Sequence, residues 1–235
     1  MGAERLPGKP LLAESGKPLV VHTLESARRA RCAARVVVAT DDARIAAAVR
    51  AAGGEAAMTS PDCRSGTDRV AEAARGIPGE DLVLNCQGDE PEVDPAALDA
   101  LAAAMEADPA IEMGTLAAPL GAESEAAAPQ VVKVVSDARG FALYFSRSPI
   151  PFRRDPAGPA RALRHVGVYA FRRAFLERFA SLPATPLERT ESLEQLRALE
   201  NGVRIRVVPV DRAPPGVDTR EDYDAFVRRR RERKP

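Results

Sequence analysis

The chain has 235 residues, with 34 Lys and Arg against 34 Asp and Glu, so its formal net charge is zero. This length suits one large domain, or a core plus a lobe, with a substantial buried core. The 45% hydrophobic content argues against intrinsic disorder. An even charge balance argues against a general nucleic-acid binder, which would carry a basic excess.

Cysteine usage and hydropathy indicate where the protein works. Cys32, Cys63 and Cys86 are far apart and form no CxxC pair, which is typical of a reducing compartment. No apolar run reaches the ~20 residues of a membrane helix, and the polar start predicts no signal peptide. With His22 and His165 as the only histidines, a His-based zinc site is not expected. The sequence therefore predicts a soluble cytoplasmic protein.

Short runs rich in β-branched residues alternate with helical patterns. The runs predict strands at 35–39, 82–86, 131–135, 165–169 and 203–208. Helices are predicted at 22–34, 42–52, 67–75, 95–107, 172–181, 186–200 and 220–233. This alternation indicates an α/β fold with a largely parallel sheet covered on both faces. The nearly apolar runs 35–39 and 82–86 are expected to be central strands. The alternating run 203–208 is expected to face solvent on one side or to lie at an edge of the sheet.

Acidic residues follow several of these predicted strands. Asp41 and Asp42 follow the first, Asp89 follows the second, and Asp218 follows the last. Ligands of open α/β sheets bind beyond the carboxyl ends of the strands, and carboxylates there suit Mg²⁺. Helix capping is the alternative, favoured for Asp41 and Asp42 and equally plausible for Asp218. The next helix begins well after Asp89, so capping does not explain that residue.

Two glycine-bearing loops offer donors to a phosphate. Arg5 and Lys9 flank a Pro-Gly turn that is not a Walker A loop, since Pro follows the lysine. Ser65-Gly66-Thr67 with Arg69 opens a predicted helix. A solvated basic turn and an ordinary helix cap are the simpler readings of these two loops when each is taken alone.

Two pairs of polar residues have a spacing that places them on one face. His165 and Tyr169 are four apart in a predicted strand, so both side chains share a face with Gly167. Glu191 and Gln195 are four apart in the predicted helix 186–200. Either pair could line a pocket; a covered sheet face and a solvated helix face are the alternatives.

Taken together, these segments resemble the 3-deoxy-manno-octulosonate cytidylyltransferases (CMP-KDO synthetases). The resemblance covers nearly the whole chain and rests on eight ordered motifs: RLPGKPL at 5–11, SGTDR at 65–69, NCQGDEP at 85–91, VKVV at 132–135, ALYFSR at 142–147, RHVGVY at 164–169, LEQLR at 193–197 and GVDT at 216–219. Other sugar nucleotidyltransferases share single motifs of this set.

The resemblance implies a reaction and a fold. The reaction is transfer of CMP from CTP to the anomeric hydroxyl of KDO, giving CMP-KDO and pyrophosphate with Mg²⁺ as cofactor, in lipopolysaccharide biosynthesis. The implied fold is the three-layer α/β sandwich of nucleotide-diphospho-sugar transferases, with a mostly parallel mixed sheet. The implied organisation is one domain over 1–235, with a nucleotide-binding core at about 1–125 and 200–235. A sugar-binding and dimerisation lobe would span about 126–200, and a homodimer is expected.

The resemblance also implies roles for individual residues. Arg5 and Lys9 would hold the triphosphate, while Asp89 and Asp218 would ligate Mg²⁺; these four form the expected catalytic set. The cytidine part would be contacted by Ser65, Gly66, Thr67, Arg69 and Gln87. The sugar-acid pocket would be lined by Arg147, His165, Tyr169, Glu191 and Gln195, with Arg147 as a partner for the carboxylate.

The chain departs from the family pattern at its start. The usual hydrophobic first strand and its Ile-Pro-Ala-Arg turn do not precede Arg5, so the fold is expected without its first strand. The Asn-Pro-Asn before the VKVV motif is replaced by Ala128-Pro129-Gln130. Two alternatives follow: a cytidylyltransferase for another sugar acid, such as 8-amino-KDO or sialic acid, or an N-terminally incomplete, weakly active CTP-binding protein.

Overall fold

The computed structural model describes residues 6–79, 81–121, 123–155 and 162–232, which group into two compact units. Unit 1 contains the described residues up to Pro78, Cys86–Asp99 and those from Pro214 onward; unit 2 contains Gly79–Asn85 and Ala100–Ala213. The sequence placed the lobe boundaries at about 125 and 200 instead. Arg5, and with it the question of a first strand, lies outside the described residues.

Unit 1 contains a small parallel sheet and several helices. Its elements are η1 (Lys9–Leu11), α1 (Leu19–Ala27), β1 (Val37–Thr40), α2 (Ala43–Ala51), β2 (Glu55–Met58), α3 (Gly66–Arg75) and α9 (Arg220–Glu232). β1 and β2 pair in parallel, with Val37 opposite Glu55. A cluster of buried side chains joins the chain start to its end: Leu6, Leu19, Val217, Tyr223, Phe226 and Val227.

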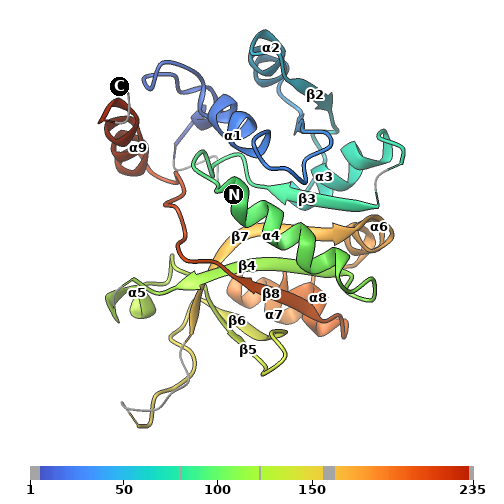
Figure 1. Ribbon diagram of the computed structural model, residues 1–235, viewed down its shortest axis with the longest axis vertical. Helices are drawn as coiled ribbons and strands as arrows, with labels where there is room; N and C mark the ends of the chain where they lie inside the picture. Colours follow the sequence, from blue (N-terminus) through green and yellow to red (C-terminus); the bar gives the residue numbers. More distant parts are fainter. Residues whose placement is uncertain (1–5, 80, 122, 156–161, 233–235) are drawn as a thin grey trace. The chain divides into compact units, whose positions relative to one another are not determined.

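Unit 2 is built on a mixed six-stranded sheet with the order β6-β5-β7-β4-β8, and β3 pairs with β7 off this path. Figure 1 shows the long strands β4 and β7 of this sheet. The strands are β3 (Leu82–Cys86), β4 (Met113–Pro119), β5 (Lys133–Ser136), β6 (Ala142–Ser146), β7 (Leu163–Arg172) and β8 (Ile205–Pro209). The helices are α5 (Glu123–Ala127), α6 (Arg173–Ser181), α7 (Pro186–Glu191) and α8 (Leu196–Glu200), while α4 (Pro95–Glu106) begins in unit 1.

Neighbouring residues of β4 show that both faces of this sheet are covered. A Cβ on Gly114 would lie 2.9 Å from the sulfur of Met105, so α4 packs closely on that face. Thr115, the next residue, points to the other face and is paired with Tyr169, whose hydroxyl reaches Gln195 at the start of α8. The α/β class with a mixed, two-sided sheet is therefore confirmed.

The sheet is less parallel than the sequence predicted. β4 pairs with β8 in parallel, but β4–β7, β5–β6 and β5–β7 are antiparallel. Of the two alternatives predicted for 203–208, the edge position is confirmed among the described strands, because β8 ends the strand order. The central positions predicted for 35–39 and 82–86 are not seen among the described residues, where β1 pairs only with β2 and β3 only with β7.

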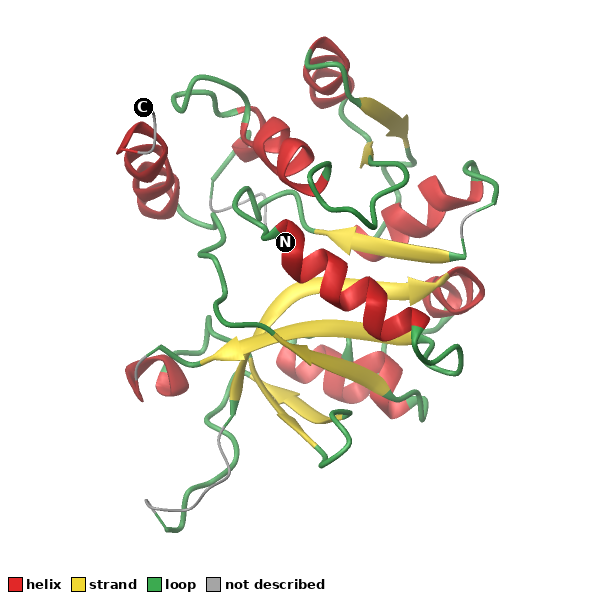
Figure 2. Cartoon of the chain, viewed as in Figure 1, coloured by secondary structure: helices red, strands yellow, loops and turns green. Residues whose placement is uncertain are grey.

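Figure 2 shows the helices, strands and loops of the described chain by colour. Several element bounds differ from the prediction. The predicted helix 22–34 is instead α1, which begins at Leu19 and ends at Ala27. The predicted helix 186–200 is broken into α7 and α8, because Ser192 adopts a left-handed φ of 51°. β2, β4, β6 and α5 were not predicted. Pro186 is the first residue of α7, and Gly202, with a left-handed φ of 75°, follows α8.

None of the helices in the described part of the chain has the length and apolar character needed to span a bilayer. The three cysteines form no disulfide within those residues.

Candidate functional site

A short turn in unit 1 presents Lys9. Gly8 takes a left-handed φ of 70°, which glycine adopts without strain, and the chain then forms the 3₁₀ turn η1. The Lys9 amide donates to Leu6 O at 3.1 Å, and Leu6 is buried in the cluster that contains Val217. Leu6 therefore anchors the turn beside Val217, and Lys9 as a whole residue is only 7% exposed.

The Lys9 ammonium joins three segments that are distant in sequence. Its Nζ donates to Asp89 Oδ2 at 2.9 Å, to Val217 O at 2.7 Å and to Asp218 Oδ1 at 3.4 Å. The Val217 amide in turn donates to Asp89 O at 2.9 Å. The structure thus brings three of the four predicted catalytic residues together, and we call Lys9, Asp89 and Asp218 the charged cluster.

The donor set of the charged cluster fits a hard divalent cation. Asp89 and Asp218 are two carboxylates that already converge on one shared positive charge, and their side chains are 33% and 64% exposed. Mg²⁺ is typically held by one or two carboxylates together with waters and substrate phosphates. Among the described residues no group of three or more His, Cys, Asp or Glu side chains forms a complete cage. The two aspartates therefore suit a Mg²⁺ ion whose other ligands come from phosphate and water.

Helix capping explains other acidic residues but not Asp218. Asp42 caps α2 by accepting from the Arg44 amide at 2.8 Å, as the simpler reading predicted. At the start of α9, Asp222 Oδ2 accepts from the Thr219 amide at 2.9 Å and from the Asp218 amide at 3.2 Å. Thr219 Oγ1 in turn accepts from the Asp222 amide at 3.2 Å. Since Thr219 and Asp222 cap α9 reciprocally, the Asp218 carboxylate is left to pair with Lys9.

The SGTDR loop begins α3 beside Gln87. Ser65 is the N-cap, and its Oγ accepts from the Asp68 amide at 3.1 Å, so the capping reading of this loop is confirmed. A Cβ on Gly66 would lie 3.2 Å from Gln87 Oε1, so the amide of Gln87 packs against bare backbone. Thr67 is 1% exposed. The structure thus brings Gln87 and this helix start together.

Arg69 connects α3 to the carboxyl ends of β1 and β2. Its Nη1 donates to Thr59 Oγ1 at 2.6 Å and to Ser60 O at 3.3 Å, just after β2. Its Nη2 donates to Asp41 Oδ2 at 2.9 Å, just after β1. Asp41 is therefore an ion-pair partner, a role that capping did not anticipate.

In unit 2, His165, Tyr169 and Gln195 form a second, neutral cluster. The rings of His165 and Tyr169 lie 5.5 Å apart, which confirms that they share a face. The Tyr169 hydroxyl donates to Gln195 Oε1 at 3.0 Å, and the Gln195 Nε2 is buried without a partner in the described structure. Burial lowers the pKa of His165 to about 3 and raises that of Tyr169 well above its usual value. We call these three residues the neutral cluster.

Glu191 and Arg147 meet through the turn between α7 and α8. The Glu191 carboxylate accepts from Ser146 Oγ at 2.6 Å and from the Arg147 amide at 2.9 Å. The Arg147 guanidinium donates to three carbonyl oxygens, those of Glu191, Ser192 and Pro129, at 2.7, 3.3 and 3.1 Å. Those N–H groups hold the turn in place. Glu191 and Gln195 do not share one helix face, because α7 ends at Glu191 and Gln195 precedes α8.

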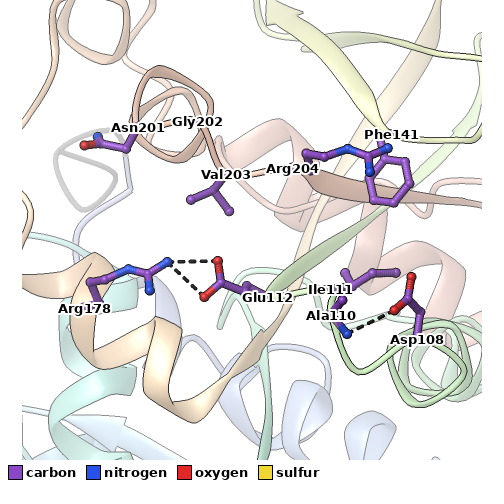
Figure 3. Close-up of a pocket in the computed structure, with 10 residues that line it drawn as sticks. All are labelled: Asp108, Ala110, Ile111, Glu112, Phe141, Arg178, Asn201, Gly202, Val203 and Arg204. Carbon is purple, nitrogen blue, oxygen red and sulfur yellow. Dashed lines mark hydrogen bonds and ion pairs between the residues drawn. The ribbon is translucent and has the colours of Figure 1, made fainter.

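A cavity of about 360 Å³ in unit 2 contains none of the predicted site residues (Figure 3). Its two arginines have partners in the cavity wall: Arg178 Nη2 lies 2.9 Å from each Glu112 oxygen, and the Arg204 guanidinium lies 3.5 Å from the Phe141 ring centre. Asp108 accepts from the Ala110 amide at 3.0 Å. The charged side chains named here therefore already have partners within the cavity wall, and the cavity is a weaker candidate for the site.

Sequence reasoning missed two buried residues that support the site in unit 2. Thr115, 0% exposed, lies 3.0 Å from His165 Nε2, but the strand containing it was not predicted. Lys133, also 0% exposed, donates to the carbonyls of Ala128, Val131 and Arg147. A lysine inside a β-branched run, in a chain with only four lysines, was the available signal for Lys133.

Comparisons with known proteins show which family this chain resembles over nearly its whole length. A family model described as "Cytidylyltransferase" matches residues 1–205. A 3-deoxy-manno-octulosonate cytidylyltransferase from Anaeromyxobacter sp. (strain Fw109-5) is 56% identical over 224 residues, covering 95% of this chain and 90% of the relative. One from Syntrophotalea carbinolica is 52% identical, covering 94% and 91%. A solved CMP:2-keto-3-deoxy-manno-octonic acid synthetase complexed with CTP has a TM-score of 0.93 and 44% identity, covering 98% of this chain and 95% of that one.

Proposed function

The chain belongs to the cytidylyltransferase family, and on that premise we propose that it transfers CMP from CTP to 3-deoxy-manno-octulosonate. The products are CMP-KDO and pyrophosphate, and the pathway served is lipopolysaccharide biosynthesis. Support comes from the names of the relatives, which are about half identical to this chain, and from the CTP named in the similar solved structure. The anomeric C2 hydroxyl of the sugar acid attacks the α-phosphorus, and the bond from that phosphorus to pyrophosphate breaks.

The charged cluster is the observation that carries this proposal. Transfer of a nucleotidyl group needs positioning and neutralisation of phosphate charge more than it needs a covalent intermediate. Lys9 supplies a cation that is almost fully buried, and such a charge acts strongly because little water screens it. Lys9 would offset the charge that builds on the departing pyrophosphate, with Arg5 as a second cation.

We propose that Asp89 and Asp218 hold Mg²⁺. When bound there, Mg²⁺ would supply Lewis-acid stabilisation and a template for the phosphate oxygens. The protein contributes the two carboxylates, whose approach is fixed by the bond from the Val217 amide to Asp89 O. Gln87, Arg69 and the Ser65-Gly66-Thr67 helix start would contact the cytidine part, because they provide amide, guanidinium and backbone donors in the same unit.

We propose that the sugar acid is recognised by unit 2, through the residues that the family resemblance implies: Arg147, His165, Tyr169, Glu191 and Gln195. The neutral cluster can exchange hydrogen bonds with sugar hydroxyls without burying a charge. The Gln195 Nε2 supports this assignment, since a buried donor without a partner is costly until a ligand or water satisfies it. Arg147 would use its remaining N–H capacity for the carboxylate.

The assembly and location are also proposals. We expect a homodimer, and the exposed apolar side chains Leu143 (62%) and Phe152 (88%) in unit 2 are surfaces that a second copy would cover. Sedimentation at several protein concentrations tests this, with Phe152→Glu expected to weaken association. A cytoplasmic location fits three cysteines that form no disulfide in the described structure.

The central experiment mixes the protein with CTP, Mg²⁺ and KDO and measures pyrophosphate release. Release that depends on all three components supports the proposal, and no release above background overturns it. A panel containing 8-amino-KDO and sialic acid decides between sugar acids by comparing kcat/KM. Thermal stabilisation by CTP without turnover would instead identify a CTP-binding protein of little activity.

A further inference from the structure

The Thr115 side chain lies at an irregularity in the pairing of β4 with β7. Thr115 pairs with Tyr169, but the next residue, Leu116, pairs with Val166, so Gly167 and Val168 have no opposite residue on β4. A bulge of this kind leaves backbone groups without their ladder partners. The Thr115 Oγ1 lies 2.8 Å from Val168 O and 3.3 Å from Val166 O. The hydroxyl can therefore donate to one of the carbonyls at the bulge, and Val168 O is the nearer.

The same hydroxyl touches the ring of His165, with Oγ1 3.0 Å from Nε2. A threonine hydroxyl has one hydrogen, and Thr115 is 0% exposed. Two oxygens 2.8 Å apart repel unless a hydrogen lies between them, so the hydroxyl hydrogen points to Val168 O. Thr115 Oγ1 must then accept from His165, which places the imidazole hydrogen on Nε2.

We infer that Thr115 is a positioning residue that closes the β7 bulge and holds His165 as its Nε2–H tautomer. The tautomer leaves a lone pair on Nδ1, so His165 meets a ligand as a hydrogen-bond acceptor. A sugar hydroxyl can donate to such a group, and a carboxylate cannot. The consequence for catalysis rests on the proposed function, whereas the tautomer itself does not.

Burial keeps this arrangement intact at neutral pH. Desolvation lowers the pKa of His165 to about 3, so the ring is neutral and has two distinguishable nitrogens. The rings of Phe145 and Tyr169, centred 5.1 and 5.5 Å from that of His165, pack against the imidazole. These two rings do not determine the tautomer, because they make no hydrogen bond to either imidazole nitrogen. The hydrogen bond with Thr115 determines it.

Nitrogen-15 NMR of the full chain tests the tautomer directly. His22 and His165 are the only histidines, so two imidazoles need to be assigned. In the unsubstituted protein at pH 7, His165 is expected to show a protonated Nε2 and an unprotonated Nδ1. The Thr115→Val variant should shift His165 toward a mixture of tautomers, and Thr115→Ser should restore the Nε2–H form. A protonated Nδ1 in the unsubstituted protein overturns the inference without any variant having to fold.

Steady-state kinetics tests the consequence. Thr115→Val should raise KM for the sugar acid about tenfold, the value of one hydrogen bond, while KM for CTP stays within twofold. Thr115→Ser should return the sugar KM to near its original value. Ser26→Ala is the matched control, because it also removes a buried hydroxyl bound to a carbonyl, Val93 O at 2.9 Å, but in unit 1.

The outcomes separate this inference from the proposed function. If no sugar acid is turned over but His165 is the Nε2–H tautomer, the function fails and the assignment of Thr115 stands. If turnover is normal and Thr115→Val changes neither the tautomer nor the sugar KM, the inference is overturned. Equal loss of function in Thr115→Val and Ser26→Ala would also overturn it, because general destabilisation would then explain the effect.

Discussion

The charged cluster of unit 1 and the neutral cluster of unit 2 handle polar groups in opposite ways. In the charged cluster, the Asp218 side chain is 64% exposed and shares one ammonium with Asp89. In the neutral cluster, Tyr169 is 7% and Gln195 2% exposed, and their contact is a single neutral hydrogen bond. The buried charge of Lys9 is thus paired with two carboxylates that water can still reach, whereas the buried neutral cluster uses uncharged groups.

This difference follows from the free energy of burial. An ionised group that loses water without a partner costs several kcal/mol, whereas a neutral group with one bond made costs far less. A site for a triphosphate and a metal must keep its charges before the ligand arrives, so it needs internal pairing such as that of Lys9. A site for sugar hydroxyls does not. Each of the following predictions tests one side of the comparison against the other.

The largest effect is expected from Lys9→Met. Removing the ammonium leaves Asp89 and Asp218 without their shared cation and takes away the charge that would face the phosphates. We expect kcat for pyrophosphate release to fall about a thousandfold, comparable to losing a fixed transition-state donor.

Lys17→Met is the matched control for Lys9. Both lysines stand in a Gly-Lys-Pro-Leu sequence, but Lys17 pairs with the half-exposed Glu25. Since a surface ion pair contributes little, its loss should change kcat less than twofold. Equal losses in the two variants would show that the charged cluster has no special role.

Asp89→Asn and Asp218→Asn should act through the metal. Each variant keeps the shape of the side chain but removes a negative ligand, so the Mg²⁺ concentration for half-maximal activity should rise about ten- to a hundredfold. Titration of activity with Mg²⁺ measures this. Asp94→Asn is the control, because Asp94 only accepts from the Ala96 amide near the start of α4. A drop in activity with unchanged Mg²⁺ dependence would argue against ligation.

The sequence predicted the residues of the charged cluster, but it did not predict strand β4 or the partner of His165 on that strand. The catalytic roles predicted for Lys9, Asp89 and Asp218 followed from ordered motifs that resemble those of the family. Taken alone, the turn with Lys9 favoured a solvated basic turn, and the position of Asp218 suited a helix cap equally well. Strand β4 was not predicted because its Gly, Ala and Pro residues have low strand propensity; its formation depends on pairing with β7 and β8. The partner of His165, Thr115, was therefore missed.

The predicted helix 186–200 shows the same limit of local reasoning. Its residues have good helix propensity, yet Ser192 adopts a left-handed conformation. Arg147 donates instead to the Glu191 carbonyl and Ser146 donates to its carboxylate, and both donors are more than 40 positions away in the sequence. Because tertiary contacts of this kind override propensity, the spacing of Glu191 and Gln195 could not by itself place them.

Low pH should lower the free energy of unfolding through two histidines, one in each unit. Burial lowers the pKa of His22 in unit 1 to about 4 and that of His165 in unit 2 to about 3, against 6.5 when unfolded. The unfolded chain then binds more protons, so stability is full above about pH 6.5 and falls as pH drops. Through each histidine, lowering the pH from 7 to 4.5 should reduce the free energy of unfolding by roughly 2 kcal/mol.

Variants separate the two histidines from the carboxylates that titrate nearby. The difference in unfolding free energy between the unsubstituted protein and His165→Asn, measured by urea denaturation, should shrink continuously from pH 6.5 to about 3. For His22→Asn the difference should stop changing near pH 4. A difference that does not vary with pH would mean that the histidine is not neutral in the folded state.

The smallest expected effect is that of Gly66→Ala, and its two parts have opposite signs. Gly66 is the first residue of α3, and alanine there should raise the unfolding free energy by about 0.5 kcal/mol by restricting the unfolded chain. The added Cβ would lie 3.2 Å from Gln87 Oε1, so the Gln87 amide must move by a few tenths of an ångström. If Gln87 contacts cytidine, KM for CTP should rise two- to fivefold while KM for the sugar acid stays constant.

Gly76→Ala is the control for this prediction. Gly76 follows the other end of α3, and a Cβ there meets only Ala73 O at 3.5 Å, so the variant should change stability without changing either KM. If Gly66→Ala is more stable but its KM for CTP is unchanged, Gln87 does not contact cytidine. The added Cβ would then stabilise the helix and displace the Gln87 amide without any effect on nucleotide binding.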